Sequence, residues 1–292
     1  MAALVLHSIG DERKTPVFDE TMDLASGYQT LRTNSFRIGH NHPPLFKVIA
    51  AAPLLAMNLA LPETWKTTDE WNFGTDFMSA NPRYHDALFV ARGVMLLVGL
   101  ALGGLVFAWG RRRDGPLGGL VALACYALYP ATLGLAGFVG ADLPLAASAA
   151  LAMWWFGGYL ERGGWRRAAL AGLGLGLCLL MKQSGILLLG AYGVCGLLAG
   201  PPRGATWGAV FRRDMPAGLA ACAAAIVVGY GVTGLPWFVE GWAVFQRLGG
   251  KGSVLNYLNG EFSLNGWWHY YAYALLVKTP PPMLALLAGY GW

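Results

Sequence analysis

Charged residues are scarce in this sequence. Only 13% of its 292 residues are Asp, Glu, Lys or Arg, whereas 55% are hydrophobic and the mean hydropathy is +0.45. A soluble globular domain usually carries about 25% charged residues. The shortage excludes a soluble domain of ordinary composition. Apolar runs of roughly 20 residues predict an integral membrane protein instead.

Several sequence signals are also missing. The four cysteines stand inside apolar runs without the spacing of a zinc site or a redox pair, so we interpret them as small buried apolar side chains. The first ten residues lack the basic region and the small-residue cleavage site of a signal peptide. No glycine-rich phosphate loop is present, and no basic segment is interleaved with aromatics as in RNA-binding proteins. We therefore expect no nucleic acid partner.

The basic residues that are present fall into clusters. Nine of the 21 Lys and Arg residues lie in three short segments between apolar runs, at 111–113, 162–167 and 203–213. Loops rich in Lys and Arg face the cytoplasm by the positive-inside rule. The formal net charge of +5 is therefore typical of a membrane protein with basic cytoplasmic loops.

Apolar runs of near-spanning length occupy most of the chain from residue 87 onward. Residues 168–200 are too long for one crossing, because 33 residues at about 1.5 Å each reach about 50 Å, whereas the hydrocarbon core is about 30 Å thick. The sequence MKQSG at 181–185 supplies a break. About six spans are predicted: 87–110, 117–137, 143–160, 168–181, 184–200 and 216–238.

The chain as a whole divides into five predicted segments. Both ends of the chain stop within apolar runs, so a fragment and a protein with an unusually placed start and stop both stay open. The segments are the remnant of a first transmembrane helix at 1–10, a long exoplasmic loop at 11–86 with an interfacial helix at 43–62, the transmembrane bundle at 87–238, an exoplasmic loop at 239–269, and the start of a further span at 270–292.

Four charged residues interrupt or border the apolar runs. A charge at such a position is costly, so each needs a partner or a function. Each predicted span crosses the membrane once, so successive loops alternate between the two faces. This alternation places the four charged residues at one face, opposite the arginine clusters: Arg92, Asp142, Lys182 and Lys278. Two simpler interpretations stay open. Asp142 could cap the next helix, and Lys182 could extend its amine to the membrane surface.

The exoplasmic loop carries further titratable groups. His40, His42 and Lys47 stand at the start of the apolar stretch RIGHNHPPLFKVIAAAPLLAMNLALP, where a simple membrane anchor has no need of them. Upstream, Asp19 and Glu20 are adjacent, so on a helix their side chains point about 100° apart and cannot form a facing carboxylate pair. One of the two is better suited to act as a base, with the other in support. An exposed acidic helix start is the alternative.

Several stretches, taken in chain order, resemble one superfamily. They are FDE with GYQTLRTNSFRIGHNHPPLFKVIAAAPLL, then ARGVMLL, GPLGGLVALACYALYP, VGADLPLA, AGLGLGLCLLMKQSGILLL and GWWHYYAYALLVKTPPPML. The sequence resembles the C-type glycosyltransferase (GT-C) superfamily, close to the protein O-mannosyltransferases and the bacterial aminoarabinose (lipid A) transferases. The resemblance covers residues 18–292.

The resemblance implies an all-α integral membrane protein, a polytopic helical bundle whose long first exoplasmic loop carries interfacial helices. It also implies an enzyme that moves a sugar, with inversion, from a polyprenyl-phosphate-linked donor to a protein, lipid or glycan acceptor. This reaction takes place on the exoplasmic or periplasmic side of the plasma or inner membrane, in contact with membrane lipids. No cofactor is certain, and a requirement for a divalent metal ion stays open. The sugar and the acceptor stay open as well.

Roles for individual residues follow from the same resemblance. Asp19 corresponds to the catalytic carboxylate of the first loop, beside Glu20, and Asp142 is a further catalytic candidate. His42 stands where the aminoarabinose enzymes have a lysine before the Pro-Pro pair. Asp23 stands where many bacterial relatives have a histidine, which leaves a metal or proton role there open. The predicted ligands of the donor phosphate and sugar are His40, His42, Arg92, Lys182 and Lys278.

Two other classes of protein stay open. A secondary transporter also has broken helices and intramembrane charges, but it favours internal repeats and charges near the membrane midplane. We find no repeat, and most of the charges sit at one face. A non-catalytic membrane subunit is the second alternative.

Overall fold

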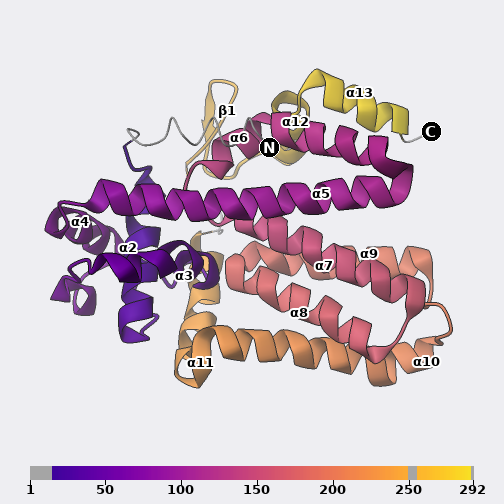
Figure 1. Cartoon of the computed structure of the whole chain (residues 1–292), viewed down its shortest axis with the longest axis horizontal. Helices are drawn as coiled ribbons and strands as arrows, with labels where there is room; N and C mark the ends of the chain where they lie inside the picture. The colour runs from indigo at the N-terminus through magenta and orange to yellow at the C-terminus, as the bar shows by residue number, and fades with distance from the viewer. Residues whose placement is uncertain (1–14, 249–254, 291–292) are drawn as a thin grey trace.

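The computed structural model describes residues 15–248 and 255–290. Helices account for 78% of the protein, in agreement with the predicted all-α class. Figure 1 shows a bundle of long helices with a group of shorter ones at its left end. The predicted helix remnant at 1–10 lies outside the described residues.

The group at the left end of Figure 1 is built by the segment between residues 15 and 83. Tyr28, Phe73 and Phe77 are fully buried in its core, so the group packs as a small helical unit. Its elements are α2 (Phe18–Thr33), α3 (Leu45–Ala51), the 3₁₀ turns η2 (Ala52–Met57) and η3 (Glu63–Lys66), and α4 (Glu70–Ala80).

The interfacial helix predicted at 43–62 is shorter and more enclosed than expected. It consists of α3 and η2, and it ends at Met57. Phe46 and Leu54 are fully buried against the protein, while Leu55 is exposed. The buried side of this segment packs on α2 and α5, whereas most residues of η2 stay exposed, so its predicted interfacial position stays a prediction.

The bundle begins with α5 (Tyr84–Leu128), which is two antiparallel helices joined by a tight turn. The turn lies at Asp114 and Gly115, and Gly115 has the left-handed φ of 73° that favours glycine. The two halves lie close enough that a Cβ on Gly110 would come within 2.6 Å of the carbonyl oxygen of Gly118. The predicted spans at 87–110 and 117–137 therefore lie side by side.

The second of these predicted spans is not continuous. The helix stops at Leu128, and a short helix, α6 (Pro130–Ala136), follows. Tyr129 has an extended backbone because the residue before a proline avoids the helical conformation, and Pro130 has no N–H to donate. The prediction of one helix over 117–137 is wrong for this reason.

The break predicted at MKQSG is confirmed. Helix α8 (Trp165–Met181) ends there, Lys182 is extended, and the 3₁₀ turn η4 (Gln183–Ile186) leads into α9 (Leu187–Ala199). Preceding them, α7 (Asp142–Arg162) packs along α8. Asp142 is the first residue of α7 rather than its N-cap, which is Ala141.

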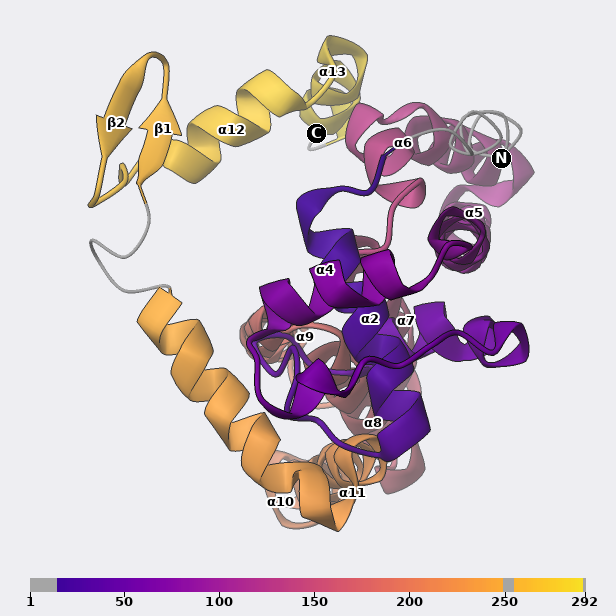
Figure 2. The same ribbon diagram turned by 90° about the vertical axis from the view of Figure 1, so that its left-hand side faces the viewer.

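The last long helix, α11 (Met215–Leu248), follows the short α10 (Trp207–Ala209) and the π-helical turn η5 (Val210–Asp214). It turns sharply at Gly231, where φ is 63°, so that its second half leaves the bundle direction (Figure 1, Figure 2). The segment predicted as the exoplasmic loop 239–269 therefore begins as helix.

The same segment also contains a β-hairpin that the sequence analysis missed. Strands β1 (Asn256–Leu258) and β2 (Glu261–Ser263) pair antiparallel around Asn259 and Gly260, both with positive φ. An Asn-Gly pair between short β-prone runs is a strong hairpin signal, and it was available in the sequence. Helices α12 (Tyr270–Lys278) and α13 (Pro281–Tyr290) follow (Figure 2).

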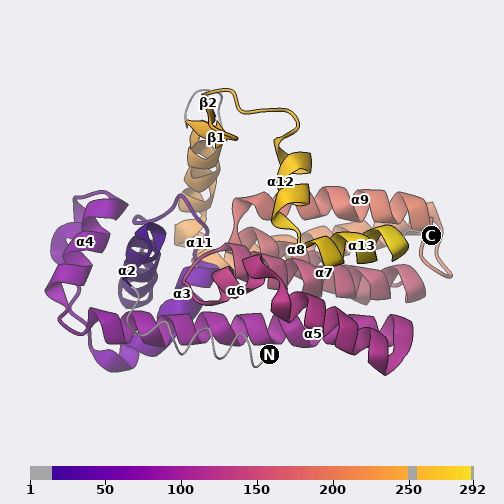
Figure 3. The same cartoon turned by 90° about the horizontal axis from the view of Figure 1, so that it is seen from above.

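The three arginine clusters meet at one end of the bundle. Arg112 forms an ion pair with Glu161, and the backbone N–H of Arg203 donates to the carbonyl oxygen of Leu160 over 3.4 Å. In Figures 1 and 3 the turn of α5 lies at the end opposite to α2, α3 and α4, and Figure 1 shows α10 at the same end as this turn. Among the described residues, three helical stretches are long and apolar enough to cross a membrane: Tyr84–Leu128, which folds back at Asp114 and Gly115, Asp142–Arg162 and Trp207–Arg247.

These opposite ends generate a test of sidedness. In a background without cysteine, an impermeant maleimide added to intact cells should modify Thr67→Cys and spare Arg166→Cys, because the positive-inside rule places the arginine end in the cytoplasm. Both side chains are exposed, so both variants should react after the membrane is permeabilised. The reverse pattern in intact cells would overturn the orientation.

Candidate functional site

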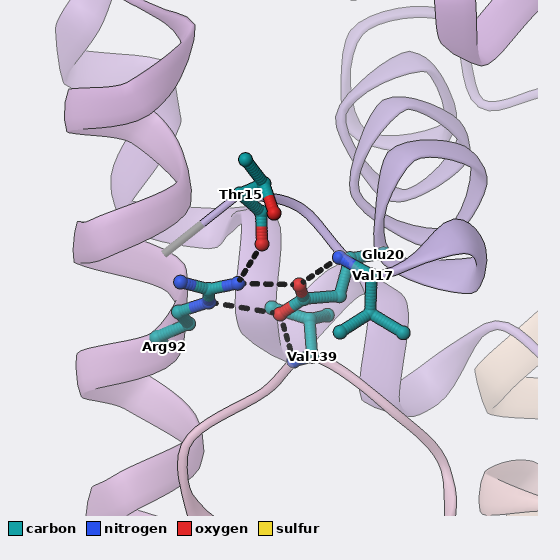
Figure 4. Close-up of polar contacts among 5 residues, drawn as sticks. All are labelled: Thr15, Val17, Glu20, Arg92 and Val139. Atoms are coloured by element: carbon teal, nitrogen blue, oxygen red, sulfur yellow. Dashed lines mark hydrogen bonds and ion pairs between the residues drawn. The ribbon is translucent and has the colours of Figure 1, made fainter. Parts of the chain in front are cut away.

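The first turn of α2 is fixed by a buried carboxylate. Glu20 has no exposed surface, and its two oxygens accept hydrogen bonds from Arg92 Nε at 3.0 Å and Nη2 at 2.6 Å (Figure 4). The backbone N–H groups of Val17 and Val139 donate to the same carboxylate at 2.9 and 2.8 Å. Arg92 Nη2 also donates to the carbonyl oxygen of Thr15 at 3.3 Å.

This arrangement joins α2 to α5 and to the segment between α6 and α7. Four donors satisfy one carboxylate, which is what a fully buried charge requires. Arg92 is 5% exposed and faces an acidic partner within the protein. Its predicted role as a phosphate ligand stays a prediction.

Asp19 points away from this contact. Its side chain is exposed at the start of α2, and no hydrogen bond or ion pair to any other residue within 15–248 or 255–290 holds its carboxylate. Adjacent residues on a helix point about 100° apart, so the inward orientation of Glu20 turns Asp19 outward. Asp19 is thus the accessible member of the pair.

One turn further along α2, Asp23 is paired with Lys47. Their side chains are each 3% exposed, with Lys47 Nζ 3.3 Å from Asp23 Oδ1, and Nζ also donates to the carbonyl oxygen of Gly39 at 2.5 Å. Burial raises the pKa of Asp23 to about 6, although Lys47 opposes the shift. Burial also lowers the pKa of Lys47, and Asp23 opposes that change. Lys47 is in the apolar stretch because Asp23 needs a counter-charge.

The two histidines lie on the turn that leads into α3. The His40 ring lies 5.3 Å from that of Trp237 on α11, and its Nδ1 is 2.8 Å from the carbonyl oxygen of Arg37. Burial, together with the nearby charges of Lys47 and Lys182, lowers the pKa of His42 to about 4. His42 is therefore neutral at physiological pH, so it can hydrogen-bond a sugar but cannot act as a cation.

The break after α8 lies next to the histidine turn. Gln183 Nε2 donates to the carbonyl oxygen of Asn41 at 2.8 Å, across 142 residues of sequence. Lys182 Nζ lies 2.5 Å from Asp142 Oδ1, and both side chains are partly exposed, at 27% and 52%. Four separate parts of the chain thus converge: the start of α2, the turn before α3, the start of α7 and the break at Lys182.

Lys278 is not among them. It is exposed at the end of α12, and none of the ion pairs found in the described chain includes it. The residues that sequence reasoning missed are Asp23 as the partner of Lys47, and Gln183 as the link to the histidine turn. A lysine within an apolar run was the available signal, since a buried charge requires a partner.

A polar cleft of about 580 Å³ opens beside the histidine turn. It lies between this turn, the start of α4 and the second half of α11, and it is lined by Arg37, His40, Glu70, Trp237 and Glu240, among others. Glu70 is followed by Trp71, whose ring stacks on Phe18 at 4.4 Å, directly before Asp19. Within the described residues no group of three His, Cys, Asp or Glu side chains is placed to hold a metal ion.

Comparison with known proteins gives one match. The family model described as dolichyl-phosphate-mannose-protein mannosyltransferase matches residues 84–230, which is 147 of the 292 residues and just over half of the chain. The matched region runs from the start of α5 into α11 and includes Arg92, Asp142 and Lys182. Neither the curated proteins nor the solved structures contain a significant match.

The contact between Glu20 and Arg92 should be a major source of stability. Arg92→Met leaves a buried carboxylate without its counter-charge, so we expect a loss of about 3–5 kcal/mol in the free energy of unfolding. Arg83→Gln breaks an exposed ion pair with Asp86 and should cost at most about 1 kcal/mol. Denaturant unfolding of the purified protein in detergent measures both. Equal stability of the two variants would contradict the role of Arg92.

The environment of His42 predicts a dependence of stability on pH. Its pKa falls from 6.5 to about 4 on folding, so the stability associated with the neutral ring is complete above pH 6.5 and is lost as the pH drops toward 4. Glutamine does not titrate, so wild type should lose more thermal stability than His42→Gln between pH 7 and 4.5. Asp23 titrates in both proteins, so its contribution to the pH dependence cancels in the comparison. His85→Gln, at an exposed site, should behave as wild type. If thermal stability fell equally with pH in wild type and His42→Gln, the buried neutral state of His42 would be contradicted.

Proposed function

The chain belongs to the dolichyl-phosphate-mannose-protein mannosyltransferase family, and we propose that it transfers a sugar from a polyprenyl-phosphate-linked donor to a hydroxyl group of an acceptor. Membership of this family supports a GT-C glycosyltransferase in general. The proposed active site is the end of the bundle where α2, the histidine turn, the start of α7 and the break at Lys182 converge. We place it on the exoplasmic or periplasmic face of the plasma or inner membrane, because the arginine clusters lie at the opposite end.

The observation that carries the proposal is the different environment of the carboxylates at this end. Glu20 is saturated by four donors, Asp23 is buried against Lys47, and Asp142 is paired with Lys182. Asp19 is exposed and has no such partner among the described residues. A general base must reach the acceptor's proton while ionised and accessible. Asp19 is accessible, whereas Glu20 would have to break the contact that holds α2 on α5.

We assign the donor to the opposite side of the same region. The phosphate leaves with growing negative charge, which a fixed cation stabilises more strongly away from bulk water. Lys182 is partly exposed and held by a single carboxylate, so the donor phosphate can replace Asp142 as its partner. Neutral His42, close to Lys182, is suited to contact the sugar. His40, Arg92 and Lys278 stay proposed as further donor ligands: Arg92 from the resemblance, Lys278 from its predicted place at the same membrane face, and His40 from the histidine-proline stretch that we interpret as a wall of the donor site.

The proposed reaction is a single displacement. Asp19 accepts the proton of the acceptor hydroxyl as its oxygen attacks the anomeric carbon from the face opposite the phosphate. The bond from that carbon to the phosphate oxygen breaks, and its electrons leave with the polyprenyl phosphate, so the configuration is inverted. The cleft beside His40 and Trp237 is the proposed entry for the acceptor, because Glu70 on its wall lies near Asp19.

Asp19→Asn tests the proposal. Asparagine keeps the shape of the side chain but removes the base, so transfer from polyprenyl-phosphate mannose should fall by about 10²–10⁴-fold at unchanged thermal stability. Asp86→Asn, an exposed aspartate at the start of α5, is the matched control and should keep wild-type transfer. Glu20→Gln should reduce thermal stability as well as activity, because it removes the buried charge partner of Arg92.

Three results would contradict the proposal. Near wild-type transfer by Asp19→Asn, together with loss in a stably folded Asp142→Asn, would identify Asp142 as the base. Equal transfer by wild type, Asp19→Asn, Glu20→Gln and Asp142→Asn would exclude base catalysis by the carboxylates of this region. Wild type without any turnover of polyprenyl-phosphate sugars would favour a non-catalytic membrane subunit.

A further inference from the structure

A second cavity lies at the arginine end of the bundle, away from the proposed active site. It has a volume of about 490 Å³ and lies between α7, α8, α9 and the segment from α10 into α11. Its walls carry two ring pairs, Phe156 with Tyr192 at 4.1 Å and Trp207 with Phe211 at 6.0 Å. Almost all of the lining is apolar. We refer to it as the apolar groove.

The apolar groove lies at the positively charged end of the bundle. Pro202 and Phe211 line the groove, and each is followed directly by an exposed arginine, Arg203 and Arg212. The three arginine clusters meet at this end, and nine arginines stand against three carboxylates in the segments that form it. An apolar slot at a cationic end of the bundle is complementary to a molecule with an apolar chain and an anionic head.

The polar group in the groove wall does not disturb this complementarity. Asp214 is fully buried, and its carboxylate accepts hydrogen bonds from Arg213 Nε at 2.8 Å and from the Tyr159 hydroxyl at 3.2 Å. Its charge is therefore compensated within the protein. Asp214 closes the π-helical turn η5, and π-helical segments in longer helices occur frequently at functional sites.

We propose that the apolar groove binds an anionic phospholipid, with an acyl chain along the aromatic wall and the phosphate beside Arg203 and Arg212. The polyprenyl chain of the sugar donor is a poorer occupant, because its phosphate belongs near Lys182 at the opposite end. A zwitterionic lipid fills the slot equally well but gains less from the charge at the arginine end. The site is independent of the proposed transferase activity.

Two glycines on α9 provide a matched pair of variants. Gly193 lines the groove, and a Cβ built on it meets no atom within 4 Å, so Gly193→Leu starts its side chain in open space at the groove. Gly190 lies on the same helix and is equally open, but it does not line the groove. Native mass spectrometry of the full chain in detergent, titrated with phosphatidylglycerol or phosphatidylcholine, reports bound lipid directly.

We expect wild type and Gly190→Leu to retain phosphatidylglycerol in preference to phosphatidylcholine, and Gly193→Leu to lose that retention by about 10-fold or more. Replacing both Arg203 and Arg212 with glutamine should abolish the preference while leaving phosphatidylcholine unchanged, since hydrogen bonds to a charged group contribute about 10-fold or more.

Equal retention of phosphatidylglycerol by Gly193→Leu and Gly190→Leu would show that the lipid does not bind in the apolar groove. An equal affinity of wild type for the two lipids would overturn the anionic headgroup. Displacement of bound phosphatidylglycerol by equimolar polyprenyl phosphate would assign the groove to the donor chain instead.

Discussion

The contact between Glu20 and Arg92 determines how the first loop sits on the bundle. It joins residues 72 positions apart, and the N–H of Val139 brings a third segment to the same carboxylate. Moving two charges out of water costs several kcal/mol per ion, and that cost is offset only when all polar atoms find partners. Here two nitrogens of Arg92 and two backbone amides supply them. The first turn of α2 therefore has one orientation on α5, and the exposure of Asp19 follows from it.

The pair of Asp23 with Lys47 applies the same constraint one turn later. Lys47 bridges Asp23 on α2 and the carbonyl oxygen of Gly39 on the histidine turn, so it fixes α3 and that turn relative to α2. Its charge also helps to keep His42 neutral, together with burial and Lys182. A neutral histidine beside a partly exposed lysine separates two tasks at the proposed donor site: one group can hydrogen-bond a sugar, and the other can hold a phosphate.

Charge divides the molecule into two ends with different properties. The arginine end has a surplus of positive charge around an apolar groove, and the opposite end has buried ion pairs around an exposed aspartate. The first end has the combination of charge and apolar surface on which we base the proposed lipid site. The second has the mixture of acceptors and cations that transfer from a phosphate requires. Helices of the bundle separate the two ends, so lipid contacts and chemistry need not compete for the same residues.

The sequence by itself determined the membrane class, the helical fold, the common end of the arginine clusters and the break at MKQSG, because these depend on local composition, run length and chain breakers. It also contained the Asn-Gly signal of the hairpin, which lies within the segment predicted as a loop. Only the tertiary structure decided which of Asp19 and Glu20 faces inward and that Arg92 and Lys47 each face a carboxylate. Helical periodicity fixes the angle between adjacent side chains, but not which of them meets the neighbouring helix. That choice depends on contacts between segments tens to more than a hundred residues apart, which no local pattern encodes.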